Sequence, residues 1–246
     1  MPRFFLSEQD SYSPRAQCVT LGGENAAHIS RSLRMAPGEE LVVCDGAGLE
    51  LGCVITMISA QEVELQVLWE RPSQSEPSVC VTLYQACPKG DKLELIVQKA
   101  VELGVCRIVP VLTRRCISRP DKKTMEKKRQ RLQKIALEAA KQSGRGIIPQ
   151  VGSLLGWGEA LEQLAQSEGP VLFYESQGTT LRDLMAPMPR EVSILIGSEG
   201  GFDPQEVEEA ARRGIQIVNL GPRILRCETA PLCALSAILY ATGNLE

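Results

Sequence analysis

The chain has 246 residues, with 43% hydrophobic and 23% charged side chains, which is ordinary for a soluble globular protein of one or two domains. Nine cysteines without a C-x-x-C pair, together with a single histidine, argue against a disulfide framework and against a bound metal. No run approaches the roughly 20 apolar residues of a membrane span, and the N-terminus has no apolar signal segment, so we expect a cytoplasmic protein with no membrane partner.

The net charge of −3 hides an uneven distribution of charged residues. Residues 1–70 contain four basic and ten acidic residues, whereas residues 114–145 contain twelve basic and three acidic ones. A basic block of this kind is typical of proteins that bind a polyanion, although most charge runs are solvated helix faces. Because the block is too one-sided to be neutralised by pairs within a helix, we expect it to contact nucleic acid.

The first part of the chain, up to about residue 70, has the pattern of short strands separated by turns. A helix is predicted over 24–35, and the lone His28 within it is interpreted as a structural residue. A small β-barrel is the natural packing of these elements. The expected strands are 3–6, 18–21, 41–44, 51–58 and 63–68.

A polar segment with prolines near both ends, residues 71–77, is predicted to link two domains, which we divide as 1–72 and 73–246. Beyond it, strands alternate with helices, a pattern that predicts an α/β fold with a mostly parallel sheet. The expected helices include an amphipathic one from about Leu93 to Gly104 and a long basic one over 122–143. The expected strands are 79–85, 107–112, 171–174, 192–196 and 215–220.

Two of these strands end in glycine loops, residues 197–201 and 221–226. After the first loop, Asp203 and Pro204 give a strong signal for a helix start, and Glu206 completes a capping box. Ligands of open α/β sheets bind at the carboxyl ends of strands, so the two loops predict a cofactor site. Neither loop matches the dinucleotide fingerprint, and the chain contains no phosphate-binding P-loop.

Several blocks of sequence, distributed almost from end to end of the chain, match one family in order. The blocks are PRFF at 2–5, HISRSLRM at 28–35, PG at 37–38, KGDKLE at 89–94, QKAVELGV at 98–105, EAAKQSGR at 138–145, LIGSEGGF at 195–202 and LGPRILRCETA at 220–230. On these blocks the chain resembles the RsmE family of small-subunit ribosomal RNA uridine-N3 methyltransferases, within the SPOUT class. It departs from the family at Ser198, where proline is usual, and at Pro231, which replaces a small helix-forming residue.

The resemblance implies an N-terminal PUA-like barrel that helps to grip RNA, and a SPOUT domain whose C-terminal segment forms a trefoil knot. It also implies a homodimer that uses S-adenosylmethionine to methylate N3 of a specific uridine in 16S ribosomal RNA, as naked RNA or in the assembled small subunit. Three alternatives stay open: a SPOUT RNA methyltransferase with another target base, a non-catalytic RNA-binding ribosome-assembly factor, and a nucleotide-dependent transferase or hydrolase.

The resemblance and the two glycine loops together indicate candidate site residues. For catalysis they are Arg226, which would stabilise charge on the uracil oxygens, and Glu199 or Glu228, which would accept the proton. The alternative for all three is an ion pair that braces the loops. The cofactor candidates are Tyr174, Glu175, Ile196, Gly197, Gly200, Gly201, Leu220, Gly221, Ile224 and Leu225. The RNA candidates are Arg3, Arg31, Arg34, Lys89, Arg114, Arg115 and Arg145.

Overall fold

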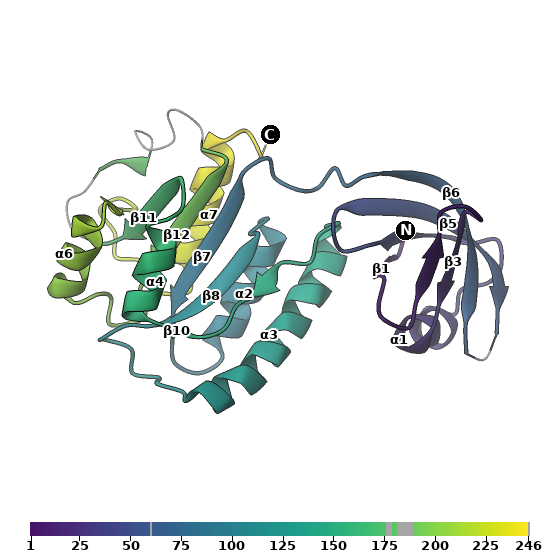
Figure 1. Ribbon diagram of the computed structural model, residues 1–246, viewed down its shortest axis with the longest axis horizontal. Coiled ribbons are helices and arrows are strands. Elements are labelled where there is room, and N and C mark those ends of the chain that lie inside the picture. Colours follow the sequence, from purple (N-terminus) through teal and green to yellow (C-terminus); the bar gives the residue numbers. More distant parts are fainter. Residues whose placement is uncertain (60, 176–178, 182–188, 246) are drawn as a thin grey trace. The chain divides into compact units, whose positions relative to one another are not determined.

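The computed structural model describes residues 1–59, 61–175, 179–181 and 189–245. The chain forms two compact units (Figure 1). The first consists of Met1–Glu76 and a returning segment, Ala140–Ile148, and the second of Pro77–Ala139 and Pro149–Glu246. The boundary predicted after residue 72 lies close to Glu76, where the first part of this unit ends, whereas the return of the later segment was not predicted.

The first unit is built on a six-stranded sheet in the order β1-β4-β5-β6-β3-β2. All neighbouring strands are antiparallel except β1 and β4, which are parallel. Register shifts in β5 after Gly52 and after Ile55 bend the long β5–β6 pair, and such bulges curl a sheet. The strands are β1 (Arg3–Phe5), β2 (Ser11–Ser13), β3 (Cys18–Leu21), β4 (Glu40–Cys44), β5 (Leu49–Ile58) and β6 (Val63–Pro72).

These elements agree with the strands expected from the sequence, apart from the short β2, which was not predicted. The predicted helix is present as α1 (Gly23–Ala27) followed by a π-helical turn, η1 (His28–Ser32). Alternate residues of the strands, among them Val19, Leu41 and Leu65, are buried in one apolar core inside the curled sheet. The expected small barrel therefore takes the form of a curled sheet with β1 and β2 at its edges.

Two carboxylates hold the ends of the first unit's chain segments together. Glu50, only 2% exposed, accepts hydrogen bonds from Arg3 (2.8 Å) and Ser73 (2.8 Å). Glu76 accepts hydrogen bonds from the guanidinium of Arg145 (2.5 Å) and from the backbone N–H of Gly146 (2.9 Å). The hydrogen bonds to Glu76 tie the returning segment to the rest of the unit. Arg145 is buried, and a buried charge requires a partner of opposite sign, which Glu76 provides.

The second unit contains a sheet in which every neighbouring pair of strands is parallel, in the order β10-β8-β7-β12-β11-β13, with β9 paired to β8. The predicted α/β class and parallel sheet are confirmed. The strands are β7 (Cys80–Ala86), β8 (Arg107–Leu112), β9 (Gln150–Val151), β10 (Leu155–Gly156), β11 (Gly169–Phe173), β12 (Glu191–Ile196) and β13 (Gln216–Val218).

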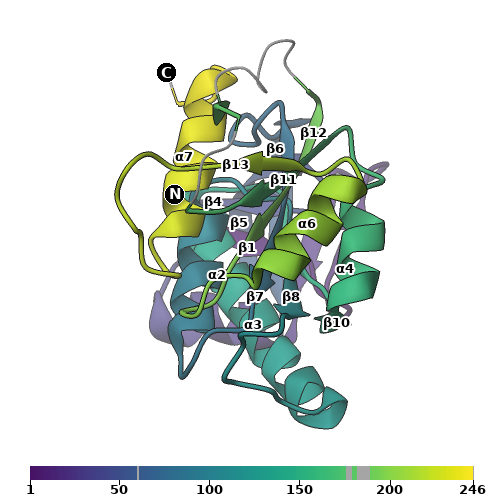
Figure 2. The ribbon, with the colours of Figure 1, turned by 90° about the vertical axis from the view of Figure 1, so that its left-hand side faces the viewer.

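Helices cover both faces of this sheet, with α4 and α6 on one face and α2 and α7 on the other (Figures 1 and 2). Helix α7 packs against both β7 and α2. The helices are α2 (Lys92–Glu102), α3 (Lys122–Ser143), α4 (Trp157–Leu164), α6 (Pro204–Arg212) and α7 (Ala230–Ala241).

The sequence signals for these helices agree with the structure. In α2 the five apolar residues at helical spacing, Leu93 to Val101, are all buried. Asp203 caps α6 by accepting a hydrogen bond from the backbone N–H of Gln205, and Glu206 completes the predicted capping box. Among the described helices, none is long and apolar enough to cross a membrane. The described residues likewise contain no cluster of potential metal ligands.

Candidate cofactor site

A pocket of about 570 Å³, part of which is open to solvent, lies where β11, β12 and β13 end. Because these three strands are parallel neighbours in register, the segments that follow them meet at the same edge of the sheet. The pocket is lined by Phe173, Tyr174, Glu175, Ile196, Gly197, Ser198, Gly201, Phe202, Leu220, Gly221, Arg223, Ile224, Leu225, Cys227 and Ala230.

All the cofactor candidates line this pocket except Gly200. A Cβ atom on Gly200 would lie 3.0 Å from Cβ and 3.1 Å from the carbonyl oxygen of Arg115. Gly200 therefore allows the loop after β8 to approach the first glycine loop, because an added Cβ would meet Arg115. The prediction that it contacts a cofactor is not supported by its position.

The first glycine loop, residues 197–201, is a tight turn held from several sides. Gly201 has φ of +63°, a conformation that favours glycine, and its N–H donates to the Ser198 carbonyl at 2.9 Å. From outside the loop, Gln85 donates to the Gly197 carbonyl at 3.2 Å and Arg115 donates to the Gly200 carbonyl at 3.2 Å. The shape of this wall of the pocket is therefore fixed by contacts within the protein.

The second loop, predicted over 221–226, extends to residue 228 in the structure, and it is held at its ends and exposed in its middle. At its start the N–H of Gly221 donates to the Asn219 side chain at 3.1 Å. At its end the carbonyl of Arg226 accepts hydrogen bonds from the N–H groups of Thr229 and Ala230. Between them Ile224 lines the pocket yet is 87% exposed. An apolar side chain so exposed beside a pocket is suited to being covered by a ligand or partner.

Lys92 on α2 joins the two loops. Its Nζ lies 3.0 Å from Glu199 Oε1 and 3.2 Å from Glu228 Oε2. Glu199 also accepts from the backbone N–H of Lys89, and the Cys227 thiol donates to Glu228 at 3.2 Å. No local pattern predicts this bridge, because Lys92 is more than a hundred residues away in sequence from both carboxylates.

These contacts determine the protonation of Glu199, Glu228 and Cys227. Burial opposes ionisation of Glu199, but hydrogen bonds from backbone N–H groups and from Lys92 outweigh it and hold the pKa of this carboxyl below its usual range. The hydrogen bond from Cys227, with those from its own N–H and from Lys92, also lowers the pKa of Glu228. Burial raises the pKa of the Cys227 thiol to about 12, so it stays a proton donor. Carboxylates of lowered pKa are weak bases.

This arrangement favours the bracing alternative for Glu199 and Glu228 over proton transfer. It does not favour that alternative for Arg226. Within the described residues, no carboxylate lies within ion-pair distance of the Arg226 guanidinium, and the residue is exposed. Arg226 is thus near the pocket, at the end of the second loop, and its charge is not neutralised by either glutamate proposed as its partner.

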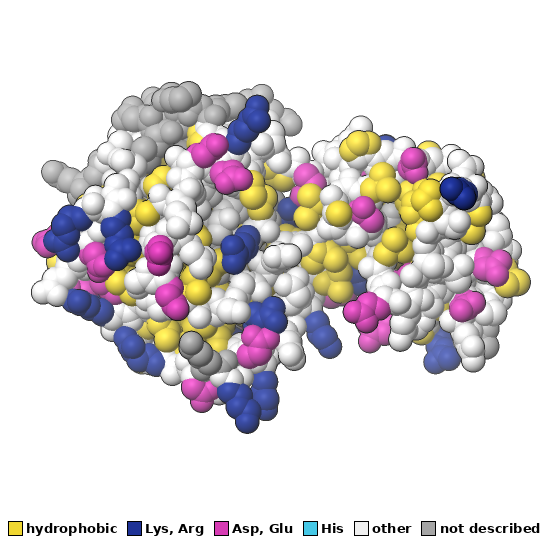
Figure 3. Space-filling view, in the orientation of Figure 1, with side chains coloured by type: hydrophobic (Ala, Val, Ile, Leu, Met, Phe, Trp, Pro, Cys, Tyr) yellow, Lys and Arg dark blue, Asp and Glu magenta, His cyan; other side chains and the backbone are white. Residues whose placement is uncertain are grey.

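Arg114 and Arg115 lie on the outer side of the first loop. Their side chains are 57% and 42% exposed, and they approach Asp203 at 3.6 and 4.0 Å. Further along the basic block, Arg129 pairs with Glu126 at 2.6 Å and Arg131 with Glu94 at 2.8 Å. Acidic partners therefore neutralise part of the block. Figure 3 shows basic side chains interspersed with acidic ones on the visible face of this unit.

The RNA candidates of the first unit fall into two groups. Arg31 and Arg34 are exposed on and after the helical turn. Arg3 is 16% exposed and paired with Glu50. Arg145 is only 3% exposed, and its guanidinium is bonded to Glu76. The prediction that Arg145 contacts RNA is therefore contradicted by its burial, and its role is to hold the returning segment.

The sequence missed several pocket residues. Phe173 lies within the predicted strand 171–174, Phe202 directly follows the first glycine loop, and Ala230 is the last residue of the family block 220–230, so all three belong to or adjoin predicted segments. Arg223 lies within the predicted second loop, but the sequence does not show that its side chain borders the pocket. Ser198 was treated only as a departure from the family. Cys227 carried no signal, since an isolated cysteine indicates nothing by itself.

Known proteins share the sequence and architecture of both units of this chain. Residues 75–239 match an RNA methyltransferase domain, and residues 21–68 match an RNA methyltransferase PUA domain. The ribosomal RNA small subunit methyltransferase E of Bacillus subtilis is 36% identical over all of this chain and 99% of its own length. The Synechocystis protein of that name is 33% identical, covering 89% of this chain and 72% of its own length.

Solved structures agree with the sequence matches. The small subunit methyltransferase E of Neisseria gonorrhoeae, bound to S-adenosylmethionine, superposes with a TM-score of 0.86 at 34% identity, covering 98% of this chain and 97% of its own. A methyltransferase of Legionella pneumophila, in complex with the same cofactor, gives 0.85 at 31% identity, covering 97% of each chain.

The two matched domains place the chain in the class of RNA methyltransferases, and the pocket at the carboxyl edge of the parallel sheet lies inside the matched methyltransferase domain. Within this class the chain belongs to the ribosomal RNA small subunit methyltransferase E family. The resemblance found in the sequence, and the enzyme class that it implied, are confirmed.

Proposed function

We propose that this protein transfers a methyl group from S-adenosylmethionine to N3 of a uridine in 16S ribosomal RNA. The observation that carries the proposal is the pocket formed by the two glycine loops, inside the matched methyltransferase domain. Two structural relatives that align over almost their whole length are solved with this cofactor, and the sequence relatives are named for the small-subunit RNA.

The pocket fits the donor chemically. Its inner wall is apolar, with Phe173, Ile196 and Phe202 all at least 94% buried, which suits the faces of an adenine base. Its outer rim is open and carries Glu175 and Arg223, whose charges suit an ammonium and a carboxylate. When bound, S-adenosylmethionine supplies an electrophilic methyl group, so the protein contributes orientation and electrostatic stabilisation.

The target atom sets the requirements on the rest of the site. N3 of uridine is on the base-pairing edge, so the base must be unpaired or extruded to react. The N3 proton is lost to solvent, and its loss leaves negative charge on the uracil oxygens. We assign the stabilisation of this charge to Arg226, whose guanidinium stays protonated at any working pH. Glu199 and Glu228 are assigned to bracing the two loops through Lys92.

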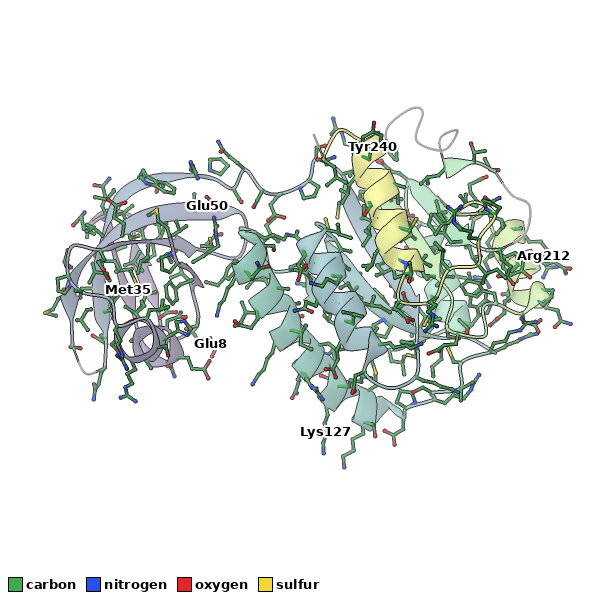
Figure 4. The ribbon with its side chains drawn as sticks, turned by 180° about the vertical axis from the view of Figure 1, so that it is seen from behind. Glu8, Met35, Glu50, Lys127, Arg212 and Tyr240 are labelled. Atoms are coloured by element: carbon green, nitrogen blue, oxygen red, sulfur yellow. The ribbon has the colours of Figure 1, made fainter. Side chains whose placement is uncertain are left out.

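We infer that RNA is gripped by two surfaces. One is the PUA unit, where Arg31 and Arg34 are exposed. The other is the outer side of the first loop, with Arg114 and Arg115, together with the exposed lysines of α3. Figure 4 shows Lys127 projecting from that helix into solvent. A 16S RNA substrate, free or in the assembled subunit, also implies a cytoplasmic enzyme, in agreement with its nine free cysteines.

We infer a homodimer from the family resemblance. It is supported by α7, which presents Cys233 and Tyr240 at the surface, the latter 67% exposed (Figure 4). Aromatic side chains are enriched in protein interfaces. Sedimentation equilibrium would decide: a mass of 26.9 kDa would contradict the dimer, and twice that mass would support it.

We also infer that the C-terminal segment is threaded into a trefoil knot. Strand β13 lies at one edge of the sheet, whereas α7, which follows it, packs on β7 and α2. The second loop must therefore pass the ends of β11 and β12, which supports a threaded path. A crystal structure traced from β12 to the C-terminus would test this inference.

The proposed activity is tested with purified protein, isotope-labelled S-adenosylmethionine and two substrates. One is 16S RNA transcribed in vitro, and the other is the small subunit assembled from it. After digestion to nucleosides, mass spectrometry should find labelled 3-methyluridine from one or both substrates, and none from transcribed large-subunit RNA. Label in a different nucleoside, or in none, would contradict the proposal.

A further inference from the structure

Ser198 carries a buried hydroxyl that the protein leaves unpaired. The residue is 6% exposed, and its Oγ has no hydrogen-bond partner within the described residues. It also lines the pocket between the two glycine loops. Most buried polar atoms in native proteins have a partner, so an unpaired hydroxyl on a residue that lines a ligand pocket is a candidate to bond the ligand.

The hydroxyl is not used by the loop itself. A serine at the first position of a turn can bond the backbone N–H two residues ahead, here that of Gly200. Instead, the turn is closed by its backbone alone, with the Gly201 N–H donating to the Ser198 carbonyl at 2.9 Å. The Gly197 carbonyl, next to Ser198, is satisfied by Gln85 at 3.2 Å. Neither contact involves the hydroxyl.

The position of Ser198 in the pocket selects one part of the donor. Ser198 belongs to the buried side, with Ile196 (2% exposed) and Phe202 (1% exposed), whereas Gly221 and Ile224 at the other side are exposed. The charged amino-acid and sulfonium groups of S-adenosylmethionine would lose much hydration in a buried apolar environment. The adenosine part has apolar faces and polar atoms along its edges, which suit a buried apolar pocket with one hydroxyl.

We propose that the Ser198 hydroxyl forms a hydrogen bond with the adenosine part of the methyl donor. This proposal rests on the proposed function, since it takes S-adenosylmethionine as the donor. The hydroxyl would be unpaired in the free protein and paired in the complex. Ser198 would then favour the bound state, because the bond that it makes in the complex relieves a buried group that is unpaired in the free protein.

The test compares the effects of removing this hydroxyl on binding and on stability. Ser198→Ala should lower the affinity for S-adenosylmethionine, measured by calorimetry, about tenfold, and the affinity for adenosine by a similar factor. In the absence of ligand its melting temperature should be unchanged or higher, because an unpaired buried group has been removed. The stabilisation by saturating donor should be smaller than in the wild type.

Thr242→Val is the matched control. Thr242 is also 6% exposed, but its hydroxyl donates to the carbonyl of Ile238 at 2.8 Å, and it is not part of the pocket. Its removal should lower the melting temperature and leave donor affinity unchanged. The two variants therefore distinguish a hydroxyl that contributes to donor binding from one that contributes to the stability of the fold.

Three results would overturn the proposal: unchanged donor affinity in Ser198→Ala, a loss seen with S-adenosylmethionine but not with adenosine, or a loss of affinity accompanied by a lower melting temperature without ligand. Absence of S-adenosylmethionine binding by the wild-type protein would overturn the proposed function and this proposal with it. The two kinds of failure are thus distinguishable.

Discussion

The two glycine loops differ in how the protein holds them. The first, 197–201, accepts hydrogen bonds from Gln85 and Arg115 and is closed by its own turn. The second, 221–228, is anchored only near its ends within the described structure, and Ile224 in its middle is 87% exposed. Both border the same pocket.

This difference indicates a division of roles between the loops. A wall fixed by internal contacts can bind a donor without rearranging, which reduces the cost of binding. A loop with an exposed middle can adjust when donor and RNA are both present. We therefore assign the first loop to holding the donor, and the end of the second, with Arg226, to the transfer.

The largest effect is expected at Gly201, where φ is +63° and a Cβ atom would lie 3.6 Å from a carboxylate oxygen of Glu175. Gly201→Val should weaken donor binding by about 100-fold or more, because it strains the turn and fills the pocket wall. Calorimetry with S-adenosylmethionine measures this effect.

Gly214→Val is the control for Gly201→Val, since Gly214 has φ of +80°, has no atom within 4 Å of an added Cβ, and is outside the pocket. It should strain the backbone equally and leave donor affinity unchanged. If Gly201→Val folds and binds the donor normally, the first loop does not hold it.

Reversal of charge at Arg115 tests whether the outer side of the first loop contacts RNA. Arg115→Glu should lower the affinity for 16S RNA about tenfold and reduce the slope of its salt dependence by about one. Donor affinity should fall less, because only the bond to the Gly200 carbonyl is lost from the loop. Filter binding over a range of salt concentrations measures both the RNA affinity and the slope of its salt dependence.

The control for that variant is Arg212→Glu on α6, which changes net charge equally at a position labelled in Figure 4. An equal loss of RNA affinity in both variants would mean that net charge, and not the outer side of the first loop, decides binding.

A smaller effect is expected at Lys92, which joins the loops. Lys92→Met should weaken donor binding about three- to tenfold, since the two ion pairs that it makes are partly exposed and such pairs are individually weak. Lys99→Met is the control on the same helix, because Lys99 pairs with Glu102 away from the pocket. Equal donor affinity in both variants would show that the loops need no bridge.

The sequence predicted what depends on local patterns. The capping box at Asp203, the buried face of α2 and both glycine loops are encoded within a few residues, and each agrees with the structure. The loops could be assigned to one site because parallel strands end at the same edge.

The rest depends on contacts between distant residues, which a single sequence does not show. Arg145 belongs to a basic block, but the structure buries it against Glu76, 69 residues away. Lys92 lies beside Glu199 and Glu228 only because α2 packs where the two loops meet. The unpaired hydroxyl of Ser198 becomes visible only when every neighbour of Oγ is known.

The division of roles is tested most directly by single-turnover methylation with Arg226→Ala. The account predicts that the rate falls roughly 10²- to 10³-fold, as when one preorganised electrostatic donor is lost, while donor affinity and melting temperature stay near the wild-type values. Arg223→Ala, in the same loop but lining the pocket, should instead reduce donor affinity. An Arg226→Ala protein that folds, binds the donor and methylates at the wild-type rate would contradict the account.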